Sequence, residues 1–215
     1  MVALAITQEG AGAPRVRAEA ALFRSAHAAL VFALHYSMQQ YDRPLMNRVA
    51  AGPAKEEGKG LSGLDGAAQA GMIRAELARL APLHQAVLVA NIAPQQVPCE
   101  CRAACCGGWK TNPEWSDAIS ELTTVAAAAA LAGCVSNGRL RSALIQRLLG
   151  AKATLADLAA RHDVDEKTAG AHSAKLKRWL FGGGGGVPGL HQQASRAFAD
   201  RLEASGLIDA PDPEK

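Results

Sequence analysis

Residues 154–180, TLADLAARHDVDEKTAGAHSAKLKRWL, predict two helices joined by a short turn. Thr154 is a favourable N-cap for the first helix, and Asp165 is the expected N-cap of the second. Between them, Val164 fills the angle of the turn, and the small side chain of Ala159 lets the second helix cross closely over the first. The stretch therefore predicts a tightly packed helical pair.

The second helix of this pair has two chemically different faces. One face is predicted to pack on a core through Ala169, His172 or Ser173, Leu176 and Leu180. The opposite face combines small and basic side chains, so the helix can enter the major groove of DNA and its first turns can reach base edges. The expected DNA-binding residues are Thr154, Glu166, Lys167, Thr168, Gly170, Ala171, Ala174, Lys175, Lys177 and Arg178.

These residues have different expected roles. Lys167 can donate to guanine O6 and N7, Thr168 can bond a base or a phosphate, and Ala171 can contact a thymine methyl group. The basic residues toward the end of the helix suit phosphates, which fix the register without reading the sequence. The alternatives are a purely structural hairpin and a module that binds another protein.

Positive charge is concentrated around the helical pair. The chain carries a formal charge of +3 at pH 7. Between Arg139 and Arg178 there are nine Lys or Arg against four Asp or Glu, a local charge of +5 that leaves −2 for the remainder. This distribution favours an anionic partner for the segment.

The stretch also resembles a known family. TLADLA at 154–159 opens like the helix-turn-helix of sigma-factor region 4 and of LuxR-type response regulators, and DEKTAGAH at 165–172 resembles the start of their recognition helix. RLRSALIQRLLGAKA at 139–153 is similar to the helix that precedes it. The resemblance covers residues 137–181. Asp163 stands where the family has a turn glycine, and small Ala169 and Ser173 stand where it has bulky apolar residues.

The resemblance implies a tetrahelical DNA-binding module with base contacts at Glu166, Lys167, Gly170 and Ala171. A cysteine-rich segment ahead of such a module also resembles prophage-encoded transcription regulators, including Q-type late antiterminators. The implied function is a DNA-binding transcriptional regulator and not an enzyme. The alternative is an adaptor or antiterminator that docks on RNA polymerase and has little DNA affinity of its own.

The chain as a whole is predicted to be an all-α helical bundle. Its 215 residues contain abundant alanine and only 4% aromatic residues, which favours helices over sheets. The expected parts are an N-terminal helical region at 1–50, a flexible linker at 51–66, a helical region at 67–136, the helix-turn-helix module at 137–181, a Gly-rich linker at 182–189 and a C-terminal helix and tail at 190–215.

Smaller signals set the expected helix ends. Pro14 suits a first helical turn, so a helix is predicted from there. Pro82 is expected to separate two helices. Asn112 is a plausible N-cap for the next helix. The C-terminal helix carries an apolar stripe with Phe198 and Leu202, which either pairs with a second copy in a homodimer or caps the core.

A cysteine-rich loop is predicted at 94–111. The expected ligands of a structural zinc ion in it are Cys99, Cys101, Cys105 and Cys106. A site that uses three of them with Cys134 or His84, redox pairing, and reduced thiols without a metal are the alternatives. Trp109 and Trp115 are expected to anchor this loop on the helices, the alternative being that they stack on bases.

The expected partners are double-stranded DNA, RNA polymerase and a second copy of the chain. No apolar run reaches the roughly 18 residues of a membrane span, so no membrane association is expected. With five cysteines, an odd number, a complete disulfide framework is not expected. The simplest location is a reducing cytoplasm.

Overall fold

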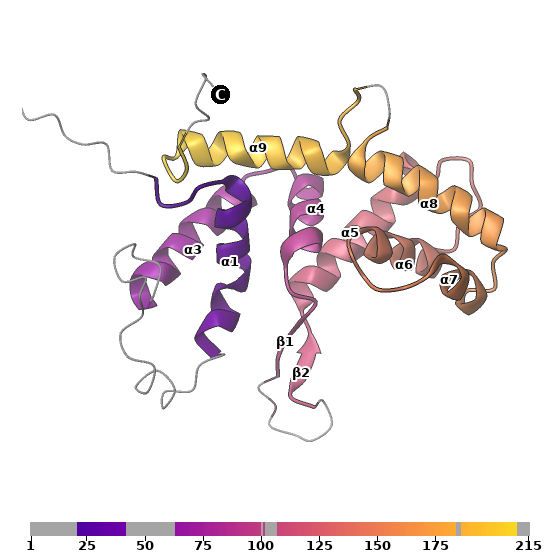
Figure 1. The fold of residues 1–215 in the computed structure, drawn as a ribbon, viewed down its shortest axis with the longest axis horizontal. Coiled ribbons are helices and arrows are strands. Elements are labelled where there is room, and N and C mark those ends of the chain that lie inside the picture. Colours follow the sequence, from indigo (N-terminus) through magenta and orange to yellow (C-terminus); the bar gives the residue numbers. More distant parts are fainter. Residues whose placement is uncertain (1–20, 42–62, 100, 102–106, 184–185, 210–215) are drawn as a thin grey trace, which may run out of the picture.

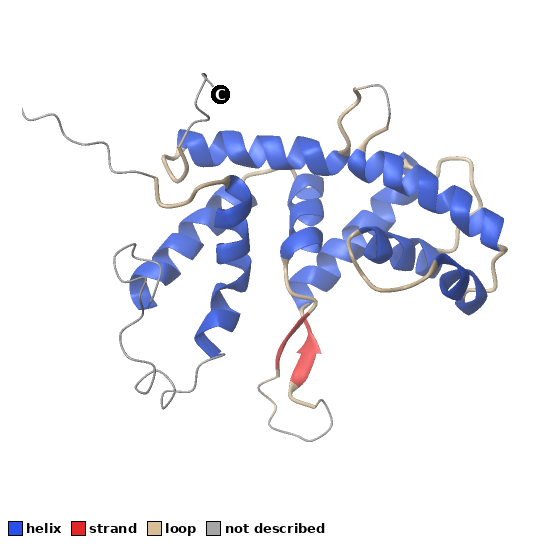
Figure 2. Ribbon diagram, in the orientation of Figure 1, coloured by secondary structure: helices blue, strands red, loops and turns tan. Residues whose placement is uncertain are grey.

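The computed structural model describes residues 21–41, 63–99, 101, 107–183 and 186–209. In this part of the chain it contains eight helices and one two-stranded sheet (Figure 2), so the predicted all-α class is confirmed apart from one short hairpin. The elements are α1 Ala26–Tyr41, α3 Gly63–Ala78, α4 Pro82–Ile92, β1 Gln96–Pro98, β2 Trp109–Thr111, α5 Pro113–Ala129, α6 Gly138–Leu148, α7 Leu155–Arg161, α8 Glu166–Phe181 and α9 Leu190–Ala204.

The first helix begins later than the sequence predicted. Pro14 lies outside the described residues, but residues 21–25 are described and are not helical, so a continuous helix from Pro14 is wrong. The Ser25 hydroxyl accepts a hydrogen bond from the Ala28 N–H (3.2 Å), which suits a helix start. Phe23 is buried and forms a parallel β-bridge with Ile208, so tertiary pairing holds this segment in an extended conformation.

The helices on either side of Pro82 agree with the prediction. α3 ends at Ala78, and α4 begins at Pro82 itself. The Gln85 side chain donates to the carbonyl oxygens of Ala78 (3.1 Å) and Leu80 (2.7 Å), which satisfies acceptors left free where α3 ends. At its other end, α3 begins at Gly63, inside the predicted linker 51–66.

The two ends of the predicted cysteine-rich loop pair as antiparallel strands and form the β1–β2 hairpin. Val97 pairs with Lys110, and Pro98 pairs with Trp109. Trp109 is 45% exposed and does not anchor the hairpin on the helices. Trp115 lies in α5, and its indole N–H donates to the Ala90 carbonyl on α4 (3.2 Å), so it joins two helices and does not anchor the loop.

Helix α9 connects the two ends of the molecule (Figure 1). It runs along one side of α1, α3 and α4, and it follows on from the end of α8. Phe198 and Leu202 are buried against the rest of the chain, so their stripe caps the core and is not an open dimer surface. On the partly exposed flank of α9, Arg201 donates to buried Glu76 on α3 (3.0 Å).

The junction between α8 and α9 is tighter than the predicted Gly-rich linker suggests. Gly182 forms an antiparallel bridge with Pro188, so the ends of the loop lie side by side. A Cβ atom at Gly189 would overlap the backbone of Phe181 and Gly182. Glycine at 189 therefore lets the first residue of α9 stack directly on the end of α8.

None of the helices in the described ranges is both long enough and apolar enough to cross a membrane.

Candidate nucleic-acid interface

Helices α6, α7 and α8 form a compact unit, named here the α6–α8 unit. Each helix has a side-chain N-cap: Asn137 accepts from the Arg139 N–H, Thr154 from the Asp157 N–H and Asp165 from the Thr168 N–H. The caps expected at Thr154 and Asp165 are therefore confirmed. Because Thr154 uses its hydroxyl oxygen as a cap acceptor, its free hydrogen-bonding capacity is mainly the hydroxyl proton.

The backbone of the turn between α7 and α8 shows how aspartate is accommodated at position 163, where the family that the sequence resembles has glycine. Asp163 has a φ of 53°, in the left-handed region that favours glycine. The Val164 N–H donates to the Ala159 carbonyl (3.0 Å), and the Asp163 N–H donates to the Ala160 carbonyl (3.3 Å). This is the Schellman pattern of a helix end, in which aspartate is tolerated better than most residues. Asp163 thus adopts the conformation that a turn glycine would take.

The inward face of α8 is the predicted one. Ala169, His172, Ser173, Leu176 and Leu180 are all buried. They pack with buried side chains of α6 and α7, which are Leu140, Leu144, Ile145, Leu158 and Ala159. The position of the core fixes the opposite face of α8 toward solvent.

The outward face of α8 is open along its length. Of the ten predicted DNA-binding residues, nine are exposed: Thr154, Glu166, Lys167, Thr168, Ala171, Ala174, Lys175, Lys177 and Arg178. Gly170 is half-buried, because the side chain of Leu155 lies beside it at the crossing of α7 and α8. Lys175 points toward the loop before α6, where its ammonium group donates to the Cys134 thiol sulfur (3.0 Å).

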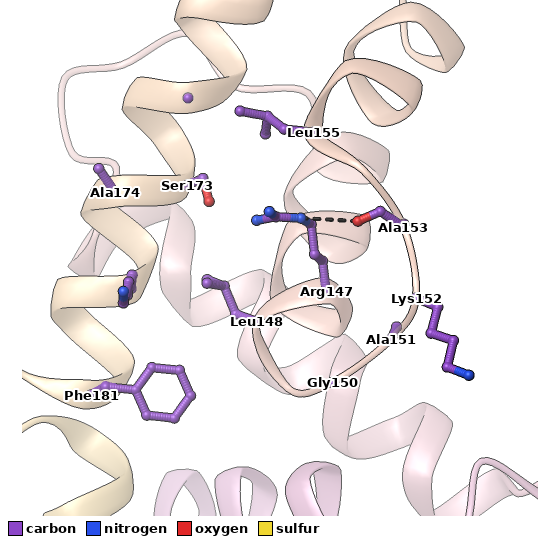
Figure 3. Close-up of a pocket in the computed structure, with 12 residues that line it drawn as sticks. Arg147, Leu148, Gly150, Ala151, Lys152, Ala153, Leu155, Ser173, Ala174 and Phe181 are labelled. Atoms are coloured by element: carbon purple, nitrogen blue, oxygen red, sulfur yellow. Dashed lines mark hydrogen bonds between the residues drawn. The ribbon is translucent and has the colours of Figure 1, made fainter.

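A groove runs between α8 and residues 147–155, and we call it the basic groove (Figure 3). Its volume is about 710 Å³. Leu148, Leu155 and Phe181 contribute apolar surface, while the charged side chains that line it are Arg147, Lys152 and Lys177. Among the described residues lining this groove, none is acidic.

Arg147 and Lys152 were not predicted as site residues. Arg147 lies near the end of α6, and its Nε donates to the Ala153 carbonyl (3.0 Å), which holds the following loop against the helix. That loop carries Lys152, which lines the same groove as Lys177 of α8. The sequence did offer one signal for them. Arg147 and Lys152 flank Gly150, a residue that commonly ends a helix, within the six positions 147–152.

Two further titratable side chains of the unit, Arg141 and His172, lie on α6 and on the buried face of α8. Arg141 donates to the Thr123 carbonyl (2.6 Å) and to the Ser136 hydroxyl, so it ties α6 to α5 and to the loop between them. Burial lowers the pKa of His172 below its usual 6.5, and nearby Lys175 and Arg141 lower it further. His172 is therefore predominantly neutral at pH 7.

None of the described residues of the β1–β2 hairpin lines the basic groove, and the zinc site stays a prediction. Cys99 is half-buried, and its N–H donates to the Gly108 carbonyl (2.8 Å); Cys101 is exposed. The other two expected ligands, Cys105 and Cys106, lie outside the described residues. Within the described ranges, no three His, Cys, Asp or Glu side chains are grouped closely enough to hold a metal ion.

The functional interpretation of this chain rests on the geometry of the α6–α8 unit, because comparisons with known proteins gave no match. No protein-family model, no curated protein and no solved structure matches this chain.

Proposed function

We propose that this protein binds double-stranded DNA through α8 and acts in transcription control. The observation that carries the proposal is the open face of α8, where small residues are exposed between basic ones on a helix held by a buried core. A helix with small outward side chains can lie deep in the major groove, which is about 12 Å wide. Cations along its edges then meet the phosphates.

Base contacts belong to the first turns of α8 in this proposal. Lys167, Thr168 and Ala171 are exposed and close to the N-terminal end of the helix, where recognition helices usually meet base edges. None of these three side chains is engaged in a hydrogen bond or ion pair with another described residue. They are free to contact a ligand without breaking a contact within the chain.

Phosphate contacts belong to the basic groove. Arg147, Lys152 and Lys177 approach it from the end of α6, from the loop and from α8. Three cations around an open groove without a lining carboxylate favour a polyanion. Because a DNA strand carries a phosphate at every nucleotide, a groove beside the reading helix is well placed for the backbone of one strand.

Binding to random-sequence duplex DNA across a salt series tests the proposal. The logarithm of the binding constant should fall linearly with the logarithm of the salt concentration. Lys167→Ala should change the sites selected from random DNA, whereas Lys177→Ala should weaken all sequences alike and reduce the salt slope by about 1. No binding at low salt by a correctly folded protein would contradict the proposal and favour the polymerase-docking adaptor.

A further inference from the structure

A second groove lies between α3, α4 and α5, and we call it the acidic groove. Its volume is about 560 Å³. Buried Leu77, Ala86 and Val89 contribute to its lining, together with exposed Ala78 and Pro82. The small alanine side chains leave room for a partner to approach the helices closely. The apolar part of this lining can therefore bury aliphatic side chains of a partner.

One wall of the acidic groove carries a row of carboxylates. Glu114, Asp117 and Glu121 lie at positions i, i+3 and i+7 of α5, so they share one face of the helix. Arg74 of α3 neutralises Glu114 through an ion pair of 2.9 Å. Asp117 and Glu121 are exposed, and neither forms an ion pair or a side-chain hydrogen bond with any residue in the described ranges. The groove thus has two carboxylates available to an external cation.

Helix ends of both signs lie at the acidic groove, because α3 ends at Ala78, α4 begins at Pro82, and both residues line it. The negative charge of the groove therefore comes from the carboxylates of α5. Gln85 donates to two carbonyl oxygens of this region and forms another part of the lining. An occupant that combines positive charge with an aliphatic face matches both features of the groove.

The geometry points to the acidic groove as a docking site for a cationic amphipathic helix of a partner protein. Aliphatic side chains of that helix cover Leu77, Ala86 and Val89, and its Lys or Arg side chains meet Asp117 and Glu121. This mode places apolar anchors in a groove and opposite charges at its rim. The site is separate from the basic groove, which is built from α6, α8 and the loop after α6.

The test uses a fluorescent 14-residue peptide of Leu, Lys and Ala whose leucines share one helical face, titrated with the full-length chain. A matched peptide has the same composition with the leucines scattered around the helix. The first peptide should bind and the scattered one should bind at least severalfold more weakly, because only the first presents an aliphatic face. Asp117→Asn combined with Glu121→Gln should weaken binding about fivefold at low salt, and less at high salt.

Two further variants separate the groove from general charge. Ala78→Trp should block binding by filling the groove, with an unchanged circular dichroism spectrum because Ala78 is exposed. Asp200→Asn combined with Glu203→Gln on α9 removes the same charge elsewhere and should leave binding unchanged. Equal binding of the two peptides, equal losses in both double variants, or displacement by spermine at matched charge would overturn the proposal.

Discussion

The basic groove and the acidic groove are built alike and charged oppositely. Each has an apolar lining supplied by packed helices, with Leu148, Leu155 and Phe181 in the first and Leu77, Ala86 and Val89 in the second. Exposed Lys side chains line the first, and exposed Asp and Glu side chains line the second. The core therefore determines the shape of both grooves, and a few exposed positions determine the class of ligand.

The largest expected effect concerns the core that supports both grooves. Leu176→Ala beneath the basic groove and Leu77→Ala in the acidic groove should each lower the free energy of unfolding by about 3 kcal/mol. Both leucines are buried, and α9 contacts both ends of the molecule. Urea unfolding should show one transition with an unchanged m-value for both variants. Two separate transitions would show that the grooves belong to independent folding units.

The next largest effect is on DNA affinity, which should depend on the basic groove and not on the acidic groove. Lys152→Gln combined with Lys177→Gln should weaken DNA binding about 50-fold at about 0.1 M salt, because two phosphate contacts and the associated counterion release are lost. The matched variant is Asp117→Asn combined with Glu121→Gln in the acidic groove. It should leave DNA affinity nearly unchanged in the same anisotropy titration. A similar loss in both variants would contradict the separation.

A third effect concerns the free energy of unfolding when one helical glycine in each region is replaced by alanine. Gly170→Ala in α8 and Gly71→Ala in α3 should each raise the free energy of unfolding by about 1 kcal/mol, because alanine restricts the unfolded chain and favours helix. A Cβ atom at 170 would meet Leu155 at 3.6 Å, an ordinary van der Waals distance, and one at 71 would meet nothing. Thermal unfolding measures both changes. Only Gly170→Ala should alter DNA binding, since Gly170 lines the basic groove.

Asp163→Gly should stabilise the chain by about 0.5–1 kcal/mol, because glycine adopts the left-handed conformation with less strain than aspartate. The φ of 53° at this position is the reason. Asp163→Val should have the opposite sign, since a β-branched residue is strained there. Urea midpoints of the two variants give the comparison. A destabilised glycine variant would mean that the Asp163 side chain makes a stabilising interaction of its own.

The smallest expected effect is the pH dependence of folding stability that comes from His172, on the buried face of α8. The pKa of His172 is lowered in the folded chain, so the unfolded chain binds its proton more readily. Folding stability should therefore rise with pH from the acid side and level off above the usual pKa of 6.5. His172→Gln should make the stability profile flatter. His191, whose pKa is lowered by burial and by nearby His27, accounts for part of the remaining slope.

Local chemistry made the α7–α8 pair predictable. Thr154 and Asp165 cap their helices through contacts with residues three positions away, and such contacts are readable from a short window. The buried face of α8 followed from helical spacing for the same reason. The open face was therefore located correctly, while its ligand stays a prediction.

Other features depend on residues distant in sequence. The segment before α1 looked helical by spacing, but Phe23 is paired with Ile208, and no local pattern reports that bridge. The β1–β2 hairpin was missed because Pro98 and the cysteines masked two short strands. Arg147 and Lys152 were missed as lining residues because the groove that they share with α8 exists only once α8 packs beside the loop.

The end-to-end stacking of α8 and α9 has a mechanical consequence. Gly189 leaves no space between the two helices, and Arg201 fastens α9 to α3 through Glu76. This packing is expected to restrain α8 from pivoting relative to α3. Ligands bound in the two proposed sites would then stay at a nearly constant distance from each other.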